Sequence, residues 1–187
     1  MRIISGTLKG KKILEPKNKN TRPLKDLTKE SIFNILIHSN KLNLKLKDAN
    51  ILDLFSGVGS FGLECLSRGS SYSTFVENYN KVLPILKKNI MNLNYENNSL
   101  VLEKNIINNL NFEIFHKKFD IIFMDPPFKE KDLNSILINI IKNDMLNAYG
   151  VIIIHRHKKE KDILPNKFKI IEEKIYGISR IIFGSYF

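Results

Sequence analysis

Apolar residues in this chain follow two different spacings. From residue 50 onward, short continuous apolar runs alternate with segments in which apolar residues recur every three or four positions. Continuous short runs are typical of buried strands, and the second spacing is typical of amphipathic helices. The alternation predicts a mainly parallel sheet with helices on both of its faces.

Seven strands are expected from these runs. Five of them predict the parallel part of the sheet, at residues 51–55, 72–76, 100–102, 119–124 and 151–154. Two more runs flank Gly177 and predict a closing antiparallel hairpin, at residues 168–175 and 178–183. Helices are expected at residues 61–68, 80–93 and 133–141. The expected fold class is α/β, a doubly wound, mainly parallel seven-stranded sheet with a C-terminal antiparallel hairpin.

The first 47 residues follow another pattern. Residues 2–14 alternate weakly and contain two glycines, which predicts a short hairpin, and the polar residues 16–23 predict a loop. An amphipathic helix is expected to start near Asp26, a suitable N-cap residue. Residues 40–47 are a polar connector. The expected organisation is a small basic extension, residues 1–47, followed by one domain, residues 48–187.

Positive charge is concentrated in that extension. The chain has 30 basic and 19 acidic residues, a net charge of +11. Residues 1–30 contain nine basic and three acidic residues, a net of +6. Part of the excess follows from a composition rich in Lys, Asn and Ile, but its concentration in one segment favours an anionic partner, nucleic acid or a membrane surface.

Cys65 is the only cysteine, so the chain forms no internal disulfide bond. Its place in an expected helix indicates a small core residue rather than a nucleophile. No signal peptide and no apolar run of membrane-spanning length are visible. A reducing, cytoplasmic location is therefore expected.

A distinctive turn follows the fourth strand, Asp125-Pro126-Pro127-Phe128. The prolines stiffen the turn and donate no backbone hydrogen bonds. The carboxylate of Asp125 and the carbonyl of Pro126 can then face one point, where a flat, amino-bearing ring stacks on Phe128. The turn favours a reaction at the exocyclic amine of a nucleobase, although Asp and Pro are also ordinary turn residues.

A glycine-rich loop follows the first strand, with Gly57, Gly59 and Gly62 entering a helix. Glu77 ends the next strand, twenty residues after Gly57, where an acid can accept hydrogen bonds from ribose hydroxyls. The spacing also matches the dinucleotide fingerprint of nicotinamide-dependent oxidoreductases. Asp53 argues against that alternative, because its carboxylate repels a pyrophosphate and suits a ligand with an ammonium group.

Together, these three strand ends resemble the class I S-adenosylmethionine-dependent methyltransferases, a Rossmann-like fold. The amino-methylating branch of that class has the Asp/Asn-Pro-Pro-aromatic turn. The basic start at residues 2–12, and Thr21-Arg22-Pro23 with Ile32-Phe33-Asn34, are similar to the RsmD family, which methylates the N2 amine of one guanine in 16S ribosomal RNA. The likeness covers nearly the whole chain.

The resemblance implies a specific set of site residues. The cofactor S-adenosylmethionine is expected at Asp53, Phe55, Gly57, Gly59, Glu77 and Asn105. Catalysis is expected at Asp125, Pro126, Pro127 and Phe128. RNA phosphates are expected at Arg2, Lys9, Lys11, Lys12, Arg22 and Lys25. For Asn105, an adenine contact and a helix N-cap are equally plausible. The expected partner is 16S rRNA, in the small ribosomal subunit or its assembly intermediate, and a metal-free monomer is expected.

The chain departs from that family at two points. Residues 27–29 are Leu-Thr-Lys where the family often has arginines, and residues 155–157 are His-Arg-His where it often has a glutamate. Residues 155–157 are expected to form a solvated, basic strand end that touches RNA, rather than a metal site. The alternatives are methylation of another nucleic acid, such as DNA adenine at N6, and the nicotinamide oxidoreductase. An inactive RNA-binding module is disfavoured because the motifs are intact.

Overall fold

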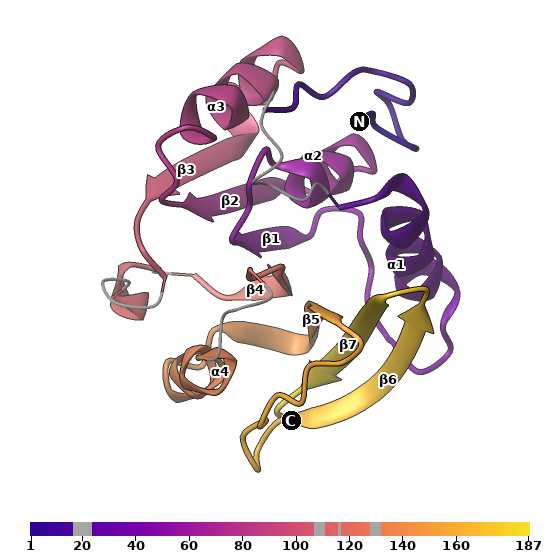
Figure 1. Cartoon of the computed structure of the whole chain (residues 1–187), viewed down its shortest axis with the longest axis vertical. Coiled ribbons are helices and arrows are strands. Elements are labelled where there is room, and N and C mark those ends of the chain that lie inside the picture. Colours follow the sequence, from indigo (N-terminus) through magenta and orange to yellow (C-terminus); the bar gives the residue numbers. More distant parts are fainter. Residues whose placement is uncertain (17–23, 107–110, 116, 128–131) are drawn as a thin grey trace.

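A computed structural model describes residues 1–16, 24–106, 111–115, 117–127 and 132–187 (Figure 1). The helices are α1 (Asp26–His38), α2 (Ser60–Ser67), α3 (Leu83–Asn92) and α4 (Leu133–Lys142), with 3-10 turns η1 (Glu96–Asn98) and η2 (Phe112–Ile114). The strands are β1 (Asn50–Leu54), β2 (Tyr72–Glu77), β3 (Ser99–Glu103), β4 (Phe119–Met124), β5 (Leu146–His157), β6 (Lys169–Tyr176) and β7 (Ser179–Ser185).

These strands form one seven-stranded sheet in the order β3-β2-β1-β4-β5-β7-β6. The first five strands are parallel, and β7 lies antiparallel between β5 and β6. The predicted fold class, a mainly parallel sheet that closes with an antiparallel hairpin, is confirmed. The parallel order places the carboxyl ends of β1 to β5 at one edge, called the carboxyl edge below.

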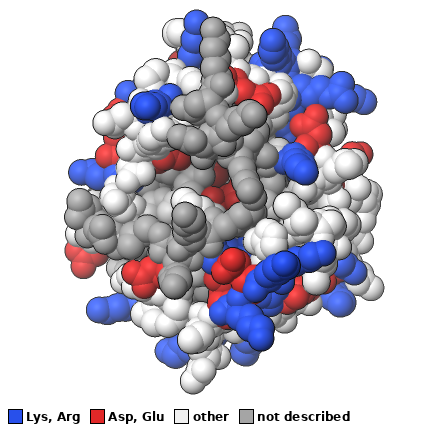
Figure 2. All heavy atoms as spheres, viewed as in Figure 1, with Lys and Arg blue, Asp and Glu red and all other residues white. Residues whose placement is uncertain are grey.

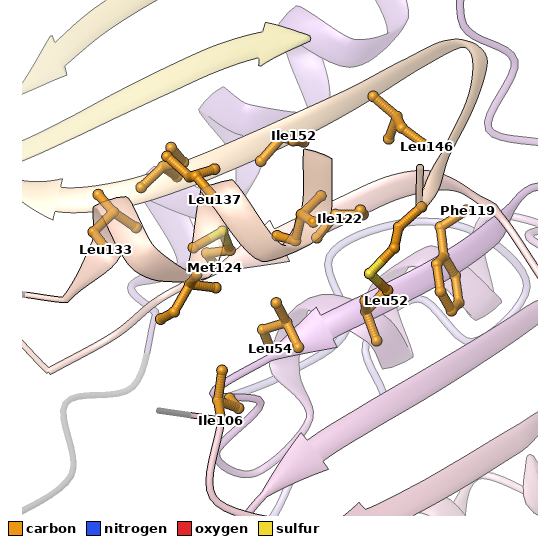
Figure 3. Close-up of a cluster of buried hydrophobic side chains, with 14 of the residues drawn as sticks. Leu52, Leu54, Ile106, Phe119, Ile122, Met124, Leu133, Leu137, Leu146 and Ile152 are labelled. Atoms are coloured by element: carbon orange, nitrogen blue, oxygen red, sulfur yellow. The ribbon is translucent and has the colours of Figure 1, made fainter. Parts of the chain in front are cut away.

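Helix α4 covers one face of the sheet. Its buried residues Leu133, Ile136, Leu137 and Ile140 have the spacing of one helical face. They pack on side chains from β1, β4 and β5, among them those of Leu52, Ile122 and Ile152 (Figure 3). Burial of each large aliphatic side chain contributes about 1.5–3 kcal/mol, so this layer is a main source of stability.

Helices α1 and α2 cover the opposite face. The rings of Phe33 on α1, Phe61 on α2 and Phe123 on β4 form a stack with centroid distances of 5.3 and 4.0 Å. Cys65 is fully buried in the same cluster, so its prediction as a core residue is confirmed. Helix α1 shares this core with the sheet. The predicted division into residues 1–47 and 48–187 stays a prediction.

The N-terminal segment forms the predicted hairpin, with Arg2 bridging Lys12. Its backbone is bound to α2, since the N–H groups of Ile4 and Ser5 donate to the Glu64 carboxylate at 2.8 and 2.9 Å. On the other side, Leu14 donates to Asn89 of α3 at 2.8 Å. The extension is therefore fastened to both helices that flank the glycine loop.

The predicted N-cap of α1 is wrong. Lys25 is the N-cap residue and makes no side-chain cap bond, while Asp26 lies in the first turn. The Asp26 carboxylate lies 3.7 Å from the guanidinium of Arg2. A charge partner and the favourable helix dipole explain an acid at this position. None of the described helices could cross a membrane.

Candidate active site

Register brings the predicted site residues to one line at the carboxyl edge. Leu54 pairs with both Val76 and Met124, and Met124 pairs with Ile154. The next residue along each strand therefore lies at the same height. This edge row consists of Glu103, Glu77, Phe55, Asp125 and His155.

Asp53 lies just below this row and is 1% exposed. Its Oδ2 accepts the N–H of Gly62 at 3.0 Å, whereas Oδ1 is buried without a hydrogen-bond partner in the described part of the chain. Burial raises the pKa of the Asp53 carboxyl well above its usual range, Gly62 opposes the rise, and the charges of Asp125 and Glu77 add to it. The edge therefore concentrates negative charge and favours a cationic ligand.

The glycine loop is built for close approach to its backbone. Gly57 and Gly59 have φ of 55° and 83°, and nothing lies within 4 Å of a Cβ placed on Gly57. Phe55 also has a positive φ, 59°, which is costly for a residue with a side chain. Packing requires a glycine at position 59, where a Cβ would lie 2.6 Å from Leu86, whereas the open space at Gly57 leaves room for a ligand.

Glu77 holds this loop in place. One oxygen accepts the N–H of Gly57 at 2.8 Å, and the other accepts those of Asn78 and Tyr79 at 2.9 Å. The carboxylate is half-buried and keeps acceptor capacity, because each oxygen has more than one lone pair. The predicted ribose contact is compatible with this position and stays a prediction.

Asp125 begins the proline turn, and its side chain is 21% exposed. Its Oδ1 lies 2.8 Å from His155 Nδ1, and the other ring nitrogen of His155 lies 2.9 Å from the Ser179 hydroxyl. Pro126 is buried and Pro127 is exposed. Phe128 lies outside the described residues.

The prediction of a solvated strand end at residues 155–157 is wrong. His155 is 8% exposed and Arg156 is 1% exposed, because β5 continues to His157 and pairs there with β7, beyond the end of β4. Arg156 forms an ion pair with Asp162 at 2.7 Å and donates to the Pro127 carbonyl at 3.2 Å. His155 and Arg156 therefore both contact the Asp125-Pro126-Pro127 turn.

The sequence predicted RNA contact for His155 and Arg156 but not their contacts with the Asp125 turn, and it gave no role to Ser179. The sequence contains a signal for His155: it directly follows the fifth apolar run, as Asp125 follows the fourth, so it is expected at the same edge of the sheet. Only the length of β5 and its antiparallel neighbour decide that these side chains are buried. Asn105 follows β3 on the same side and stays a predicted adenine contact.

The predicted RNA-binding residues that the structure describes lie along the N-terminal hairpin and at the start of α1. Arg2 and Lys12 pair across the hairpin, near the start of α2, where Lys29 binds both Arg2 and Ser60. The hairpin tip lies at the far end of α2, bound to Ser67. The exposed members of the set are Arg2, Lys9, Lys11, Lys12 and Lys25, and Arg22 lies outside the described residues. On the face of the molecule that Figure 2 draws, basic side chains are spread out with acidic ones between them.

Comparison with known proteins identifies the family. Residues 1–185 match the family described as conserved hypothetical protein 95. This chain belongs to that family. It is 34% identical over 174 residues to ribosomal RNA small subunit methyltransferase D of Buchnera aphidicola from Acyrthosiphon pisum, covering 92% of this chain and 86% of that one. It is 33% identical over 184 residues to YlbH of Bacillus subtilis, named as a candidate rRNA methyltransferase, covering 97% and 96%.

A solved structure supports the same assignment. The protein yhhF of Escherichia coli, described as a candidate methyltransferase, superimposes with a TM-score of 0.80 over 98% of this chain and 96% of that one, at 27% identity. The order of the sheet is that of class I methyltransferases. This member of the family is a methyltransferase, and its cofactor is S-adenosylmethionine.

The residues present fit that cofactor. S-adenosylmethionine carries an ammonium group and a sulfonium, and no phosphate. The unpartnered Oδ1 of Asp53 and the raised pKa of its carboxyl indicate a carboxylate that a positive charge nearby would stabilise. The open backbone at Gly57 leaves room for a ligand beside Glu77.

Proposed function

We propose that this chain transfers a methyl group from S-adenosylmethionine to the exocyclic N2 amine of a guanine in 16S rRNA of the small ribosomal subunit. The observation that carries the proposal is the edge row, in which Asp125 begins its proline turn beside the glycine loop and Glu77. The relatives named as ribosomal RNA small subunit methyltransferase D support rRNA as the substrate.

The turn would make a poor nucleophile reactive. The lone pair of a guanine N2 amine is delocalised into the ring. The Asp125 carboxylate and the Pro126 carbonyl would accept its two N–H groups and rotate them out of the plane, which restores lone-pair character. Orientation is the larger part of this effect.

Bound S-adenosylmethionine would supply the electrophile, a methyl group on a positively charged sulfur. When bound, it would give up this methyl group to the amine nitrogen and would keep the electron pair of the broken carbon–sulfur bond, while Asp125 and Pro126 hold the amine in line. The methylated nitrogen then carries one surplus proton, which leaves through the Asp125 carboxylate. We expect the reaction to need no metal ion.

The target base must reach the turn outside a helix. A paired guanine has its N2 amine inside the base stack, so the nucleotide is unpaired or flipped out. Phe128 would stack on the base, and Pro127 would stiffen the segment between them. Around the cofactor, Asp53 would face the cationic groups, Phe55, Gly57 and Gly59 would line the backbone side, Glu77 would bind the ribose, and Asn105 would meet the adenine.

The basic extension would hold RNA phosphates, which give affinity without sequence information. Replacing Lys9, Lys11 and Lys12 with Gln should weaken RNA binding and reduce the slope of log K against log salt by up to about 2–3, since each phosphate contact contributes roughly 0.7–0.9. Binding titrations at several salt concentrations measure this slope. An unchanged slope would mean that the hairpin does not contact RNA.

The sequence is also compatible with two other functions. Methylation of another nucleic acid shares every residue of the edge row and is separated only by substrate. No observation favours the nicotinamide oxidoreductase, because Asp53 is buried beneath the loop that would have to carry a pyrophosphate. A cytoplasmic location and a monomeric state stay predictions.

Labelled methyl transfer tests the proposal. The protein is incubated with labelled S-adenosylmethionine and small ribosomal subunits that lack the modification, beside duplex DNA and the Asp125→Ala variant. Label recovered from 16S rRNA as N2-methylguanine, and lost in the variant, is the expected result. Label only in DNA would replace the proposal with DNA methylation, and label at another position of the RNA would show that the nucleobase amine is wrongly chosen.

A further inference from the structure

We propose that His155 is the positioning residue for Asp125, and that it fixes which carboxylate oxygen faces the target amine. This inference rests on the proposed function, because it names a further residue of the same reaction. It concerns a histidine at a position where the sequence analysis expected a solvated strand end.

The backbone brings the two side chains together without any loop rearrangement. Met124 and Ile154 are register partners on the parallel strands β4 and β5, so the following residues, Asp125 and His155, lie side by side. Their side chains meet at 2.8 Å between Oδ1 and Nδ1. Both positions are therefore set by the register of the sheet.

The hydrogen-bond chain has one consistent direction at its catalytic end. An ionised carboxylate only accepts hydrogen bonds, so Nδ1 of His155 carries the proton that points at Asp125. The other ring nitrogen, Nε2, lies 2.9 Å from Ser179 Oγ. A hydroxyl can donate or accept, so Ser179 satisfies that nitrogen whether the ring is neutral or charged.

This pairing assigns different tasks to the two oxygens of Asp125. Oδ1 is taken by His155, while no donor in the described residues reaches Oδ2. The Asp125 side chain, in the edge row at the carboxyl edge, is 21% exposed. Oδ2 is therefore the oxygen available to accept the N–H of a substrate amine.

The neighbouring residue restrains the other end of the turn. Arg156 is held by Asp162 and donates to the carbonyl of Pro127 at 3.2 Å. Consecutive residues of β5 thus hold two residues of the turn, one through its carboxylate and one through its backbone. Misplacing a reacting group by about 1 Å can cost on the order of 100-fold in rate, so such restraints matter for transfer.

Amide substitutions at His155 distinguish positioning from packing. Asn places its side-chain N–H near the location of Nδ1, whereas Gln places its own near Nε2. Relative to wild type, His155→Asn should keep the single-turnover methyl-transfer rate within about threefold, and His155→Gln and His155→Ala should lower it about 10- to 100-fold. KM for RNA and the affinity for S-adenosylmethionine should stay unchanged in all three variants.

The outcome that overturns the inference is equally specific. If Asn and Gln variants have the same rate, or if rates follow the unfolding midpoints of the variants, His155 has only a packing role. Loss of RNA or cofactor affinity with an unchanged transfer rate would also overturn it.

A spectroscopic measurement decides the pairing without any methyl transfer. Two-bond nitrogen–proton correlation spectra of the protein with labelled histidines report which ring nitrogen carries a proton, and the His155 signal is the one missing in His155→Asn. A proton on Nδ1 in wild type, lost from it in Asp125→Ala, supports the inference. A ring protonated on Nε2 alone overturns it. If the spectra support the pairing while wild type methylates no RNA, the proposed substrate fails and the pairing stands.

Discussion

Asp53 and Glu64 are both buried carboxylates beside the glycine loop, yet their surroundings differ completely. Glu64 is fully buried and accepts from two backbone N–H groups, from Arg68 at 2.8 Å, and from Lys29, whose Nζ lies 3.3 Å away. Asp53 has one donor, Gly62, and a buried oxygen without a partner in the described residues. Hydrogen-bond donors are thus present in the buried region beside the loop, but most of them contact Glu64 and only one contacts Asp53.

The difference indicates what each acid does. The Glu64 cluster joins the extension, α1 and α2. Burial lowers the pKa of the Lys29 ammonium, and the charge of Glu64 opposes part of that shift. Closed polar networks of this kind fix a structure. The open carboxylate of Asp53 lies instead under the edge row, where a ligand can complete it. We therefore propose that Glu64 stabilises the fold and that Asp53 serves cofactor binding.

The largest expected effect breaks the closed cluster. Lys29→Met removes the ammonium and leaves Glu64 with one cation fewer at a fully buried position. The free energy of unfolding should fall by about 3–5 kcal/mol, because an incompletely compensated buried charge remains. Denaturant titration measures the change. Lys87→Met, which removes an ion pair whose side chains are both more than half exposed, is the matched control and should cost less than about 1 kcal/mol. Equal effects would contradict the contrast.

Gly62 in α2 has closely packed surroundings, whereas Gly57 in the glycine loop has open ones. In Gly62→Ala the new Cβ would lie 2.4 Å from the buried ring of Phe75, which should cost about 1–3 kcal/mol despite the better helix propensity of Ala. In Gly57→Ala it would meet nothing, and only the positive φ should cost about 1 kcal/mol. Thermal unfolding of both variants checks this order. A Gly57→Ala variant less stable than Gly62→Ala would mean that the loop is not open.

The smallest expected stability effect has the opposite sign. A carboxyl whose pKa is raised by folding binds its proton more tightly in the folded state, so its ionisation destabilises the fold at neutral pH. Without cofactor, Asp53→Asn should therefore raise the free energy of unfolding by about 1 kcal/mol at pH 7. The gain should vanish near pH 3, below the usual Asp pKa of about 3.9, where both states are protonated. A loss of stability at pH 7 would show that the ionised carboxylate is satisfied within the protein.

Strand positions could be predicted from the sequence because each parallel strand is a continuous apolar run. The predicted range 119–124 matches β4 at both ends. The start of β5 could not be predicted, since Leu146 to Gly150 includes polar and exposed residues, and only Leu146 of this stretch has a register partner on β4, Phe119. The start of α3 at Leu83 differs from the predicted residue 80, although Pro84 lies in the first turn as expected.

Some residues of the candidate site could likewise be predicted from the sequence, and others could not. Asp53, Glu77 and Asp125 could be found because each ends or follows an apolar run. The partners of Glu64 could not, since Ile4, Ser5 and Lys29 are distant in sequence and meet it only in the folded state. His155 was misjudged because a charged-looking tripeptide at a strand end resembles a solvated one, and only β7 on its other side buries it.

Calorimetric titration with S-adenosylmethionine tests most directly whether the Asp53 carboxylate binds the cofactor. Wild type is compared with Asp53→Asn and with Asp120→Asn, a carboxylate near the start of β4 that accepts from Asn50 at 2.7 Å and Asn147 at 2.8 Å. Asp53→Asn should weaken binding about tenfold or more, which corresponds to about 1.4 kcal/mol, and Asp120→Asn should leave it unchanged. Equal affinity of wild type and Asp53→Asn would contradict the assignment of Asp53 to the cofactor.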